Sequence, residues 1–403
     1  MAGVSFIIIL IFILVGAHYF GKGAERMKLP SLLGMMGFGL LIGPALLNIL
    51  PTVTLNQAGF FKDTALVIVL FIAGLGISWQ QMKTIGRPAV LLSSVPALLE
   101  GFTIAGLAMW LFDFNFVQGA ILGFIIAAVS PAVLIPAMID LVQRRYGEKK
   151  AIPQMLLVGA SADDTIAITF FTMFLTIYTQ QAQGLTANPW QQLLQIPLML
   201  IVSISVPFLL AKLLHPLLKR MNHPLLLVGV TFFCAYIMRV VETTTHTPIF
   251  NSLLAVMMFG FFLRFDFEAK AILVQVQMQR LWQYGKVYLF VFVGAAIDPF
   301  LVGNFFLSGG LMLLISLTVR SLGVYLSLIG TNLTWSERFF CAIAYLPKAT
   351  VQSAKAGVPL QAGVAGGEEM QALAILSVLI TAPIGAIGIK YFAPKILEQA
   401  VDE

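Results

Sequence analysis

Thirteen long apolar runs, separated by short polar connections, make up most of the chain. A helix that crosses the hydrocarbon core of a bilayer needs about 20 residues, and lipid tolerates apolar side chains all round such a helix. The runs therefore predict transmembrane helices over residues 4–20, 31–50, 64–81, 88–112, 115–142, 152–178, 189–212, 225–241, 249–264, 283–298, 304–329, 336–356 and 369–393.

The composition supports this interpretation and excludes an ordinary soluble enzyme. The 403 residues are 59% hydrophobic and 10% charged, and the mean hydropathy is +0.94, whereas an average soluble domain has about 25% charged residues. The opening Met1–His18 has no positive n-region and no convincing cleavage site, so we expect an uncleaved first transmembrane helix. We predict an all-α polytopic membrane protein without a sizeable soluble domain.

Basic residues lie mainly in alternate connections. Lys62, Arg239 and Lys355 fall on the side with few basic residues. By the positive-inside rule the N-terminus lies outside and the C-terminus in the cytoplasm, and the short loops suggest a bacterial inner membrane. The net charge of +6 thus reflects topology and does not indicate a nucleic-acid partner. The basic residues on the cytoplasmic side are Lys22, Arg26, Lys28, Lys83, Arg87, Arg144, Arg145, Lys149, Lys150, Lys212, Lys219, Arg220, Arg264, Lys270, Arg280, Arg338, Lys390 and Lys395.

Metal-ligating residue types are scarce. Cys234 and Cys341 both fall in apolar runs, and the four histidines lie far apart. Neither a disulfide framework nor a zinc site is indicated, and we expect no cofactor.

Five charged residues fall near the middle of predicted spans, where each costs at least about 2.5 kcal/mol. Glu100 and Arg320 lie in the fourth and eleventh helices, and we expect them to form an ion pair that holds the helix bundle together. Lys348 follows Pro347, where it either offsets a half-helix dipole or extends into an internal water cavity. The other two are the adjacent carboxylates Asp163 and Asp164, which mutual neutralisation of an acid and a base does not explain.

The aspartate pair predicts a cation and proton site. It lies in Gly-Ala-Ser-Ala-Asp-Asp-Thr, so Ser161 and Thr165 add oxygen atoms beside Asp163 and Asp164. Neighbours on a helix point about 100° apart, so the two carboxylates have different surroundings. Burial and a second nearby carboxylate both favour the protonated form, so at least one can exchange a proton near neutral pH. Such an oxygen site can hold either H⁺ or a small cation such as Na⁺.

Mid-span prolines predict two interrupted helices in an inverted repeat. Pro131, preceded by Ser130, lies in the fifth helix and Pro347 in the twelfth, 216 residues later; Glu100 and Arg320 are 220 apart. Proline interrupts a helix, and an offset of seven helices inverts the second copy, as in transporters whose broken helices cross at the midplane. An offset of 218 from Asp164 reaches Ala382, so we expect one cation site per protomer.

Four segments carry a family resemblance. SPAVLIPAMID, GASADDTIAI, ISLTVRSLG and YLPKATVQSA resemble the signatures of the monovalent cation/proton antiporter superfamily. Within its aspartate–aspartate branch, which includes NapA and NhaA, the chain is most similar to the NHA-type sodium/proton exchangers.

The resemblance implies an NhaA-like fold and a homodimer of elevator transporters. It assigns residues 1–87 and 225–298 to a dimerisation domain, 88–178 and 299–403 to the two repeats of a core transport domain, and 179–224 to a linker helix. It also implies that Asp164 is the principal Na⁺ and H⁺ carboxylate, with Asp163 beside it and Ser130 and Pro131 at the helix crossing. NapA-like members have a lysine where this chain has Arg320. Because arginine stays protonated, this departure favours electroneutral exchange.

The function predicted is therefore Na⁺ or Li⁺ exchange for H⁺, with a role in sodium and pH homeostasis and no enzymatic activity. A K⁺/H⁺ antiporter and a sodium-coupled organic-anion symporter of the same fold are the alternatives. An intramembrane aspartyl protease is a poor match, because its two aspartates come from separate helices and adjacent residues cannot face each other.

Overall fold

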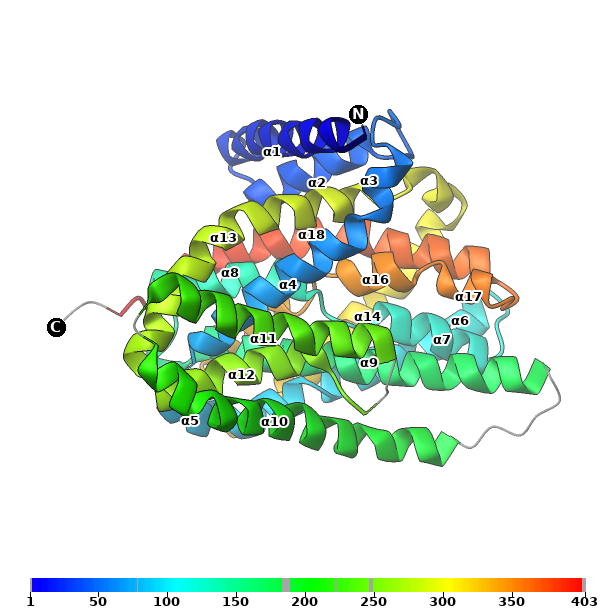
Figure 1. Cartoon of the computed structure of the whole chain (residues 1–403). Coiled ribbons are helices and arrows are strands. Elements are labelled where there is room, and N and C mark those ends of the chain that lie inside the picture. The colour runs from blue at the N-terminus through cyan, green and yellow to red at the C-terminus, as the bar shows by residue number, and fades with distance from the viewer. Residues whose placement is uncertain (1, 78, 183–188, 222, 246–248, 401–403) are drawn as a thin grey trace. The chain divides into compact units, whose positions relative to one another are not determined.

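The computed structural model describes residues 2–77, 79–182, 189–221, 223–245 and 249–400, and these are almost entirely helical (Figure 1). Their β structure is a single isolated bridge between Tyr146 and Gln399. Ten helical stretches in this part of the chain are long and apolar enough to cross a membrane. The predicted all-α membrane fold is confirmed, whereas the number of thirteen spans stays a prediction.

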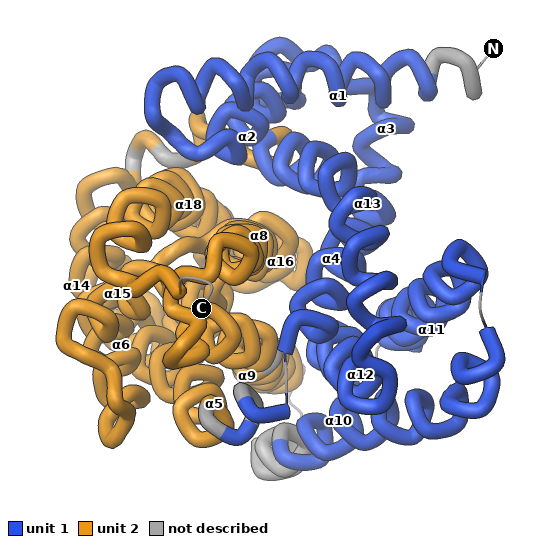
Figure 2. Tube along the Cα trace, turned by 90° about the vertical axis from the view of Figure 1, so that its left-hand side faces the viewer, with its two compact units in different colours: residues 1–84, 195–294 blue, residues 85–194, 295–403 orange. Residues whose placement is uncertain are grey.

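The chain divides into two compact units, coloured separately in Figure 2. Unit 1 comprises residues 1–84 and 195–294, and unit 2 comprises residues 85–194 and 295–403. The dimerisation and transport roles that the sequence suggests for such segments stay predictions.

Unit 1 is a bundle in which α4 packs closely on α12. A Cβ at Gly74 of α4 would lie 1.9 Å from the Met257 carbonyl oxygen of α12, so only glycine permits this approach, as is common in membrane helices. The helices of unit 1 are α1 (Ala2–Arg26), α2 (Ser31–Ile42), α3 (Thr52–Asn56), α4 (Ala58–Leu75), most of α10 (Pro189–Arg220), α11 (Pro224–Thr245), α12 (Ser252–Asp266) and α13 (Glu268–Ala295).

Of the predicted spans in unit 1, the second and the tenth differ most from the structure. The second helix ends at Ile42 rather than at residue 50, because Gly43 precedes Pro44 and takes an extended conformation that the following proline favours. Helix α13 begins at Glu268 rather than at residue 283. The region 268–282 is rich in polar residues, yet Ala271, Val274 and Met278 are buried at helical spacing, so Lys270 and Arg280 lie in a helix rather than in a connection.

Unit 2 contains both interrupted helices, and in each a short non-helical segment separates two half-helices. Helix α6 packs on α7 and α14, α7 packs on α9, and α15 packs on α18. The helices of unit 2 are most of α5 (Trp79–Leu92), α6 (Val95–Leu111), α7 (Phe116–Ile126), α8 (Pro131–Gln143), η1 (Glu148–Lys150), α9 (Ile152–Ala182), η2 (Pro299–Phe305), α14 (Phe306–Ser327), α15 (Trp335–Ala344), α16 (Thr350–Lys355), α17 (Val358–Gln361) and α18 (Gly367–Ile396).

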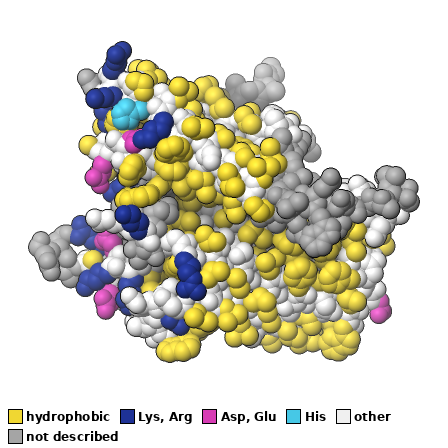
Figure 3. Space-filling view, turned by 90° about the horizontal axis from the view of Figure 1, so that it is seen from below, with side chains coloured by type: hydrophobic (Ala, Val, Ile, Leu, Met, Phe, Trp, Pro, Cys, Tyr) yellow, Lys and Arg dark blue, Asp and Glu magenta, His cyan; other side chains and the backbone are white. Residues whose placement is uncertain are grey.

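The molecular surface is typical of a protein that faces lipid. Large apolar side chains such as Leu213, Phe233 and Leu314 are more than 60% exposed. Figure 3 shows that hydrophobic side chains cover most of one face, whereas Lys and Arg gather toward one end of it. Lipid rather than water is the solvent that such a surface requires.

Candidate ion-binding site

The two helix breaks meet inside unit 2. Helix α7 ends at Ile126 and α8 begins at Pro131, while α15 ends at Ala344 and α16 begins at Thr350. The Ser130 N–H donates to the Pro347 carbonyl over 2.8 Å, so the first break bonds directly to the second. The structure thus places the predicted crossing residues Ser130, Pro131 and Pro347 together.

Side chains from the second repeat donate hydrogen bonds to the carbonyl groups at the C-terminal end of α7. The Gln352 amide nitrogen donates to the Ile125, Ile126 and Ala128 carbonyls over 3.1, 3.1 and 2.8 Å. The Ala127 carbonyl accepts from the Arg320 guanidinium and, over 3.2 Å, from the Lys348 ammonium. Lipid cannot bond these carbonyls, and the positive groups also offset the negative end of the α7 dipole.

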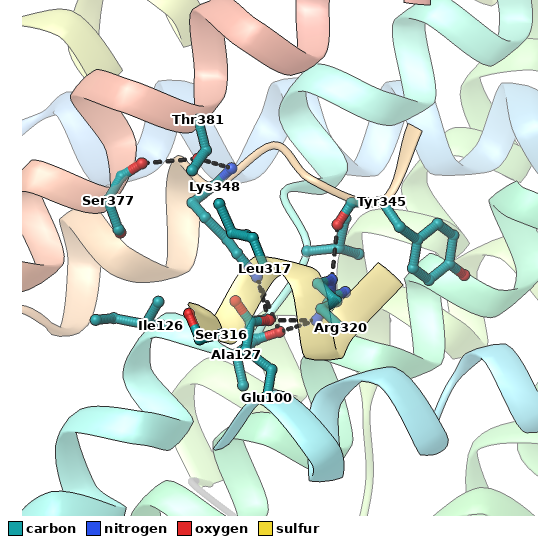
Figure 4. Close-up of polar contacts among 12 residues, drawn as sticks. Glu100, Ile126, Ala127, Ser316, Leu317, Arg320, Tyr345, Lys348, Ser377 and Thr381 are labelled. Carbon is teal, nitrogen blue, oxygen red and sulfur yellow. Dashed lines mark hydrogen bonds and ion pairs between the residues drawn. The ribbon is translucent and has the colours of Figure 1, made fainter. Parts of the chain in front are cut away.

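The backbone of the second break is satisfied in a similar way. Arg320 Nε donates to the Tyr345 carbonyl over 2.7 Å. The Lys348 N–H donates to Thr381 Oγ1 of α18 over 2.9 Å, and the Ala349 N–H donates to Gln352 Oε1 over 2.9 Å. Figure 4 shows Thr381 and Arg320 reaching this segment from different helices. The breaks are therefore rigidly bonded rather than loose.

Four buried charges form one cluster around the crossing. Glu100 Oε2 accepts from Arg320 Nη1 over 2.7 Å and from Lys348 Nζ over 2.6 Å (Figure 4). Arg320 Nη2 lies 3.3 Å from both oxygens of Asp163, whose Oδ2 also accepts the Val129 N–H over 2.8 Å. All four side chains are 0% exposed. Two acids and two bases leave the cluster neutral, as burial requires.

Asp164 stands apart from this cluster. It is 1% exposed, its Oδ1 has no hydrogen-bond partner, and no basic side chain in the described residues forms an ion pair with it. The Ser130 hydroxyl is also buried without a partner. Asp164 is therefore a buried carboxylate that no basic side chain in the described residues neutralises.

Three other predicted site residues, Ser161, Lys348 and Arg320, have hydrogen-bond or ion-pair partners in the structure. Ser161 donates to the Leu157 carbonyl over 2.8 Å, and the side chain of Thr165 lies outside the described residues. Lys348 pairs with Glu100 and caps Ala127, which favours the dipole-offsetting alternative over an internal water cavity. Arg320 contacts Glu100, its predicted partner, and it also contacts Asp163.

Two residues at the crossing, Gln352 and Thr381, had no predicted role. Gln352 is the third residue of α16, and a glutamine at this position can bond the backbone N–H of the residue before the helix, here Ala349. The sequence therefore contained a signal for the role of Gln352. Thr381 is an ordinary neutral residue in an apolar helix and carried none. Among the described residues there is no group of three or more His, Cys, Asp or Glu that could hold a metal ion.

Known proteins resemble this chain over nearly its whole length. A family model described as "Sodium/hydrogen exchanger, transmembrane" matches residues 8–394. The human sodium/hydrogen exchanger 9B2 is 29% identical over 386 residues, covering 92% of this chain and 70% of that protein. The human sodium/hydrogen exchanger 9B1 is 27% identical over 383 residues, covering 93% and 74%.

A solved structure has the same fold. The sodium proton antiporter MjNhaP1 from Methanocaldococcus jannaschii superposes with a TM-score of 0.77 at 21% identity, covering 98% of this chain and 99% of that one. The predicted antiporter superfamily is confirmed, and its members are transporters rather than enzymes. The chain belongs to the transmembrane sodium/hydrogen exchanger family.

Proposed function

We propose that this protein exchanges Na⁺ or Li⁺ for H⁺ across a membrane and that the two ions compete for Asp164. The observation that carries the proposal is the separation of Asp164 from the neutral cluster of Glu100, Asp163, Arg320 and Lys348. A buried carboxylate without a basic partner is stable only when a proton or a cation neutralises it. Family membership and the names of the relatives support sodium as the cation.

The same charge balance supports electroneutral exchange. Arg320 remains charged under physiological conditions, and Lys348 is held by Glu100. If neither base releases its proton, one monovalent cation replaces one proton at Asp164 in each cycle, and no net charge crosses the membrane.

Several wider features belong to the same proposal. The division into two compact units supports an elevator movement of unit 2, with unit 1 forming the interface of a homodimer. The distribution of basic residues supports an external N-terminus and a cytoplasmic C-terminus. The bacterial inner membrane stays a prediction from the short loops, and the relatives named above are from human and Methanocaldococcus jannaschii.

Transport by purified protein in liposomes tests the proposal. A pH gradient is imposed, a lumenal pH dye reports proton flux, and Na⁺, Li⁺ or K⁺ is added in turn, with and without valinomycin and K⁺ to clamp the voltage. We expect flux with Na⁺ and Li⁺ that does not depend on voltage. Flux with K⁺ alone would indicate a K⁺/H⁺ antiporter, voltage-dependent flux would refute electroneutrality, and no flux with any cation would refute the proposal.

A further inference from the structure

Two arginines of unit 2 converge on the turn between α14 and α15. Arg87 of α5 donates from Nη1 to the Ile329 carbonyl over 3.1 Å, and Arg338 of α15 donates from Nη2 to the Thr331 carbonyl over 3.2 Å. Two residues of chain span at most about 7 Å. Two guanidinium groups from distant parts of the sequence therefore border the same short turn.

The turn is shaped for the approach of Arg87. The Thr331 N–H donates to the Leu328 carbonyl over 3.2 Å, and Gly330 between them has a φ of +80°, which glycine adopts without strain. A Cβ at Gly330 would lie 3.0 Å from Arg87 Nη1. The glycine therefore leaves room for the guanidinium against the backbone, and the turn fixes its position.

The positive charge of the two arginines is not neutralised by the protein. No ion pair among the described residues involves Arg87 or Arg338. Glu337, which precedes Arg338, is held by Lys150 over 2.7 Å. A guanidinium carries five N–H donors, and each arginine gives one hydrogen bond to the turn. Apart from the buried Nε of Arg338, the remaining donors are available to an anion.

Trp335 lies beside these charges. Its side chain is 75% exposed, its ring centre is 5.9 Å from that of Tyr325, and the Arg338 guanidinium carbon lies 5.5 Å from the same ring centre. Tryptophan and tyrosine are enriched where the hydrocarbon of a bilayer meets the lipid headgroups. The aromatic pair therefore places Arg338 at the level of the headgroups.

An apolar stripe leads from the arginines along α14. Leu322, Leu326 and Ile329 are each more than half exposed, and their spacing of four and three residues puts them on one face of the helix. Such a face lies against the acyl chains of lipids. The arginines and the stripe thus match the two parts of one phospholipid, whereas a free anion would use only the arginines.

We propose that this surface, formed by Arg87, Arg338, Trp335 and the exposed face of α14, binds an anionic phospholipid with its phosphate group at the two arginines. A planar guanidinium suits a phosphate because two of its N–H groups can bond two oxygens at once. Both arginines are among the residues predicted to face the cytoplasm, where anionic lipids attract basic side chains. The proposal does not depend on the exchange function, because none of these residues belongs to the candidate ion site.

Lipid titration of delipidated protein in detergent tests the proposal. Phosphatidylglycerol is compared with phosphatidylcholine of the same acyl chains, and the melting temperature reports binding. Phosphatidylglycerol should raise it at a lower concentration, and high salt should reduce the difference. Equal action of the two lipids would overturn the proposal. Inorganic phosphate should have no effect, and a shift as large as that with phosphatidylglycerol would mean that a free anion rather than a lipid is bound.

Arg87→Gln and Arg338→Gln test the position of the site. Each should raise the midpoint concentration of phosphatidylglycerol about fivefold, as for the loss of one basic residue near an anionic surface, without changing the response to phosphatidylcholine. Arg144→Gln is the matched control, because Arg144 is an exposed arginine of the same unit, and it should keep the wild-type midpoint. An equal rise in the control would indicate general charge attraction and overturn the proposal.

Arg338→Lys separates the shape of the side chain from its charge. Lysine keeps the positive charge without the planar fork, so the midpoint should lie between those of the wild type and Arg338→Gln. Each shift is measured from the melting temperature of the same variant without lipid, so a less stable turn does not imitate lost binding. A wild-type midpoint in both glutamine variants would refute the site.

Discussion

The two repeats of unit 2 use equivalent positions for different chemistry. In the first repeat Asp163 of α9 accepts the Val129 N–H of the helix break, and in the second Thr381 of α18 accepts the Lys348 N–H. Asp163 and Thr381 are 218 residues apart. The hydroxyl of Thr381 therefore accepts the same kind of backbone N–H bond as the carboxylate of Asp163. This bond does not explain the second carboxylate, because the residue that corresponds to Asp164 in the other repeat is Ala382.

Gln352 introduces a second asymmetry at the crossing. The Ser130 N–H bonds directly to the Pro347 carbonyl. The equivalent bond on the other side would join Ala349 to Ala128, but the Gln352 amide lies between them, accepting from Ala349 and donating to Ala128. The repeat thus supplies the crossed scaffold, and a few unmatched side chains make its two sides differ.

The largest effect should come from removing the unmatched acid. Asp164→Asn should lower cation-dependent proton flux in liposomes at least about 100-fold, because no remaining group there exchanges a proton for a cation. Its melting temperature should stay at or above that of the wild type, since Asp164 Oδ1 has no hydrogen-bond partner and no ion pair among the described residues involves Asp164. Asp140→Asn, on the exposed end of α8, is the matched control and should transport normally. Substantial flux through Asp164→Asn would place the site elsewhere.

A smaller but still large effect should follow when the shared ion pairs are broken. Glu100→Gln leaves Arg320 and Lys348 facing each other with less compensation, and we expect it to destabilise the protein by about 3–5 kcal/mol. Lys348→Gln leaves Glu100 paired with Arg320 and should cost less. The double variant should be more stable than the sum of the singles implies, by about 1–3 kcal/mol. Thermal unfolding in detergent measures this, and additive losses would contradict the pairing.

The sequence predicted some of these contacts but not others. The apolar runs predicted the all-α membrane fold, and the mid-membrane charges together with Pro131 and Pro347 predicted the interrupted helices and the residues to examine. The sequence could not show that Arg320 contacts two acids, because both contacts depend on how α6, α9 and α14 pack. It gave no role to Gln352 and Thr381, since neutral polar residues reveal their partners only when backbone groups of distant segments come near.

Removing the neutral acceptor of the second repeat should have an intermediate effect. Thr381→Val keeps the shape of the side chain but leaves the Lys348 N–H buried without a partner, which costs about 1–3 kcal/mol. Thr318→Val is a fair control because Thr318 is exposed on α14 and bonds only within its own helix. We expect the melting temperature to fall clearly in Thr381→Val and little in Thr318→Val. Equal changes would mean that the acceptor role of α18 is unimportant.

The smallest effects concern the starts of the half-helices. Asn115 and Gln118 form a capping box at α7, and Thr334 and Glu337 form one at α15, each 219 residues later. In each capping box, the side chain of the second residue also bonds to a connecting segment of the other repeat. Gln118 donates to the Ala365 carbonyl over 2.8 Å before α18, and Lys150 before α9 pairs with Glu337 over 2.7 Å.

The bond of Gln118 is neutral and that of Lys150 is an ion pair, so only the contribution of Lys150 to stability should depend on salt. Lys150→Gln should cost less than about 1 kcal/mol, because the lysine side chain is 30% exposed, and the loss should shrink as ionic strength rises. Gln118→Ala should cost a similar amount at every ionic strength. Melting curves of both variants at low and high salt make the comparison. The same salt dependence in both variants would mean that the charge of Lys150 contributes nothing to stability. The difference in charge between the two repeats would then affect stability only at the crossing.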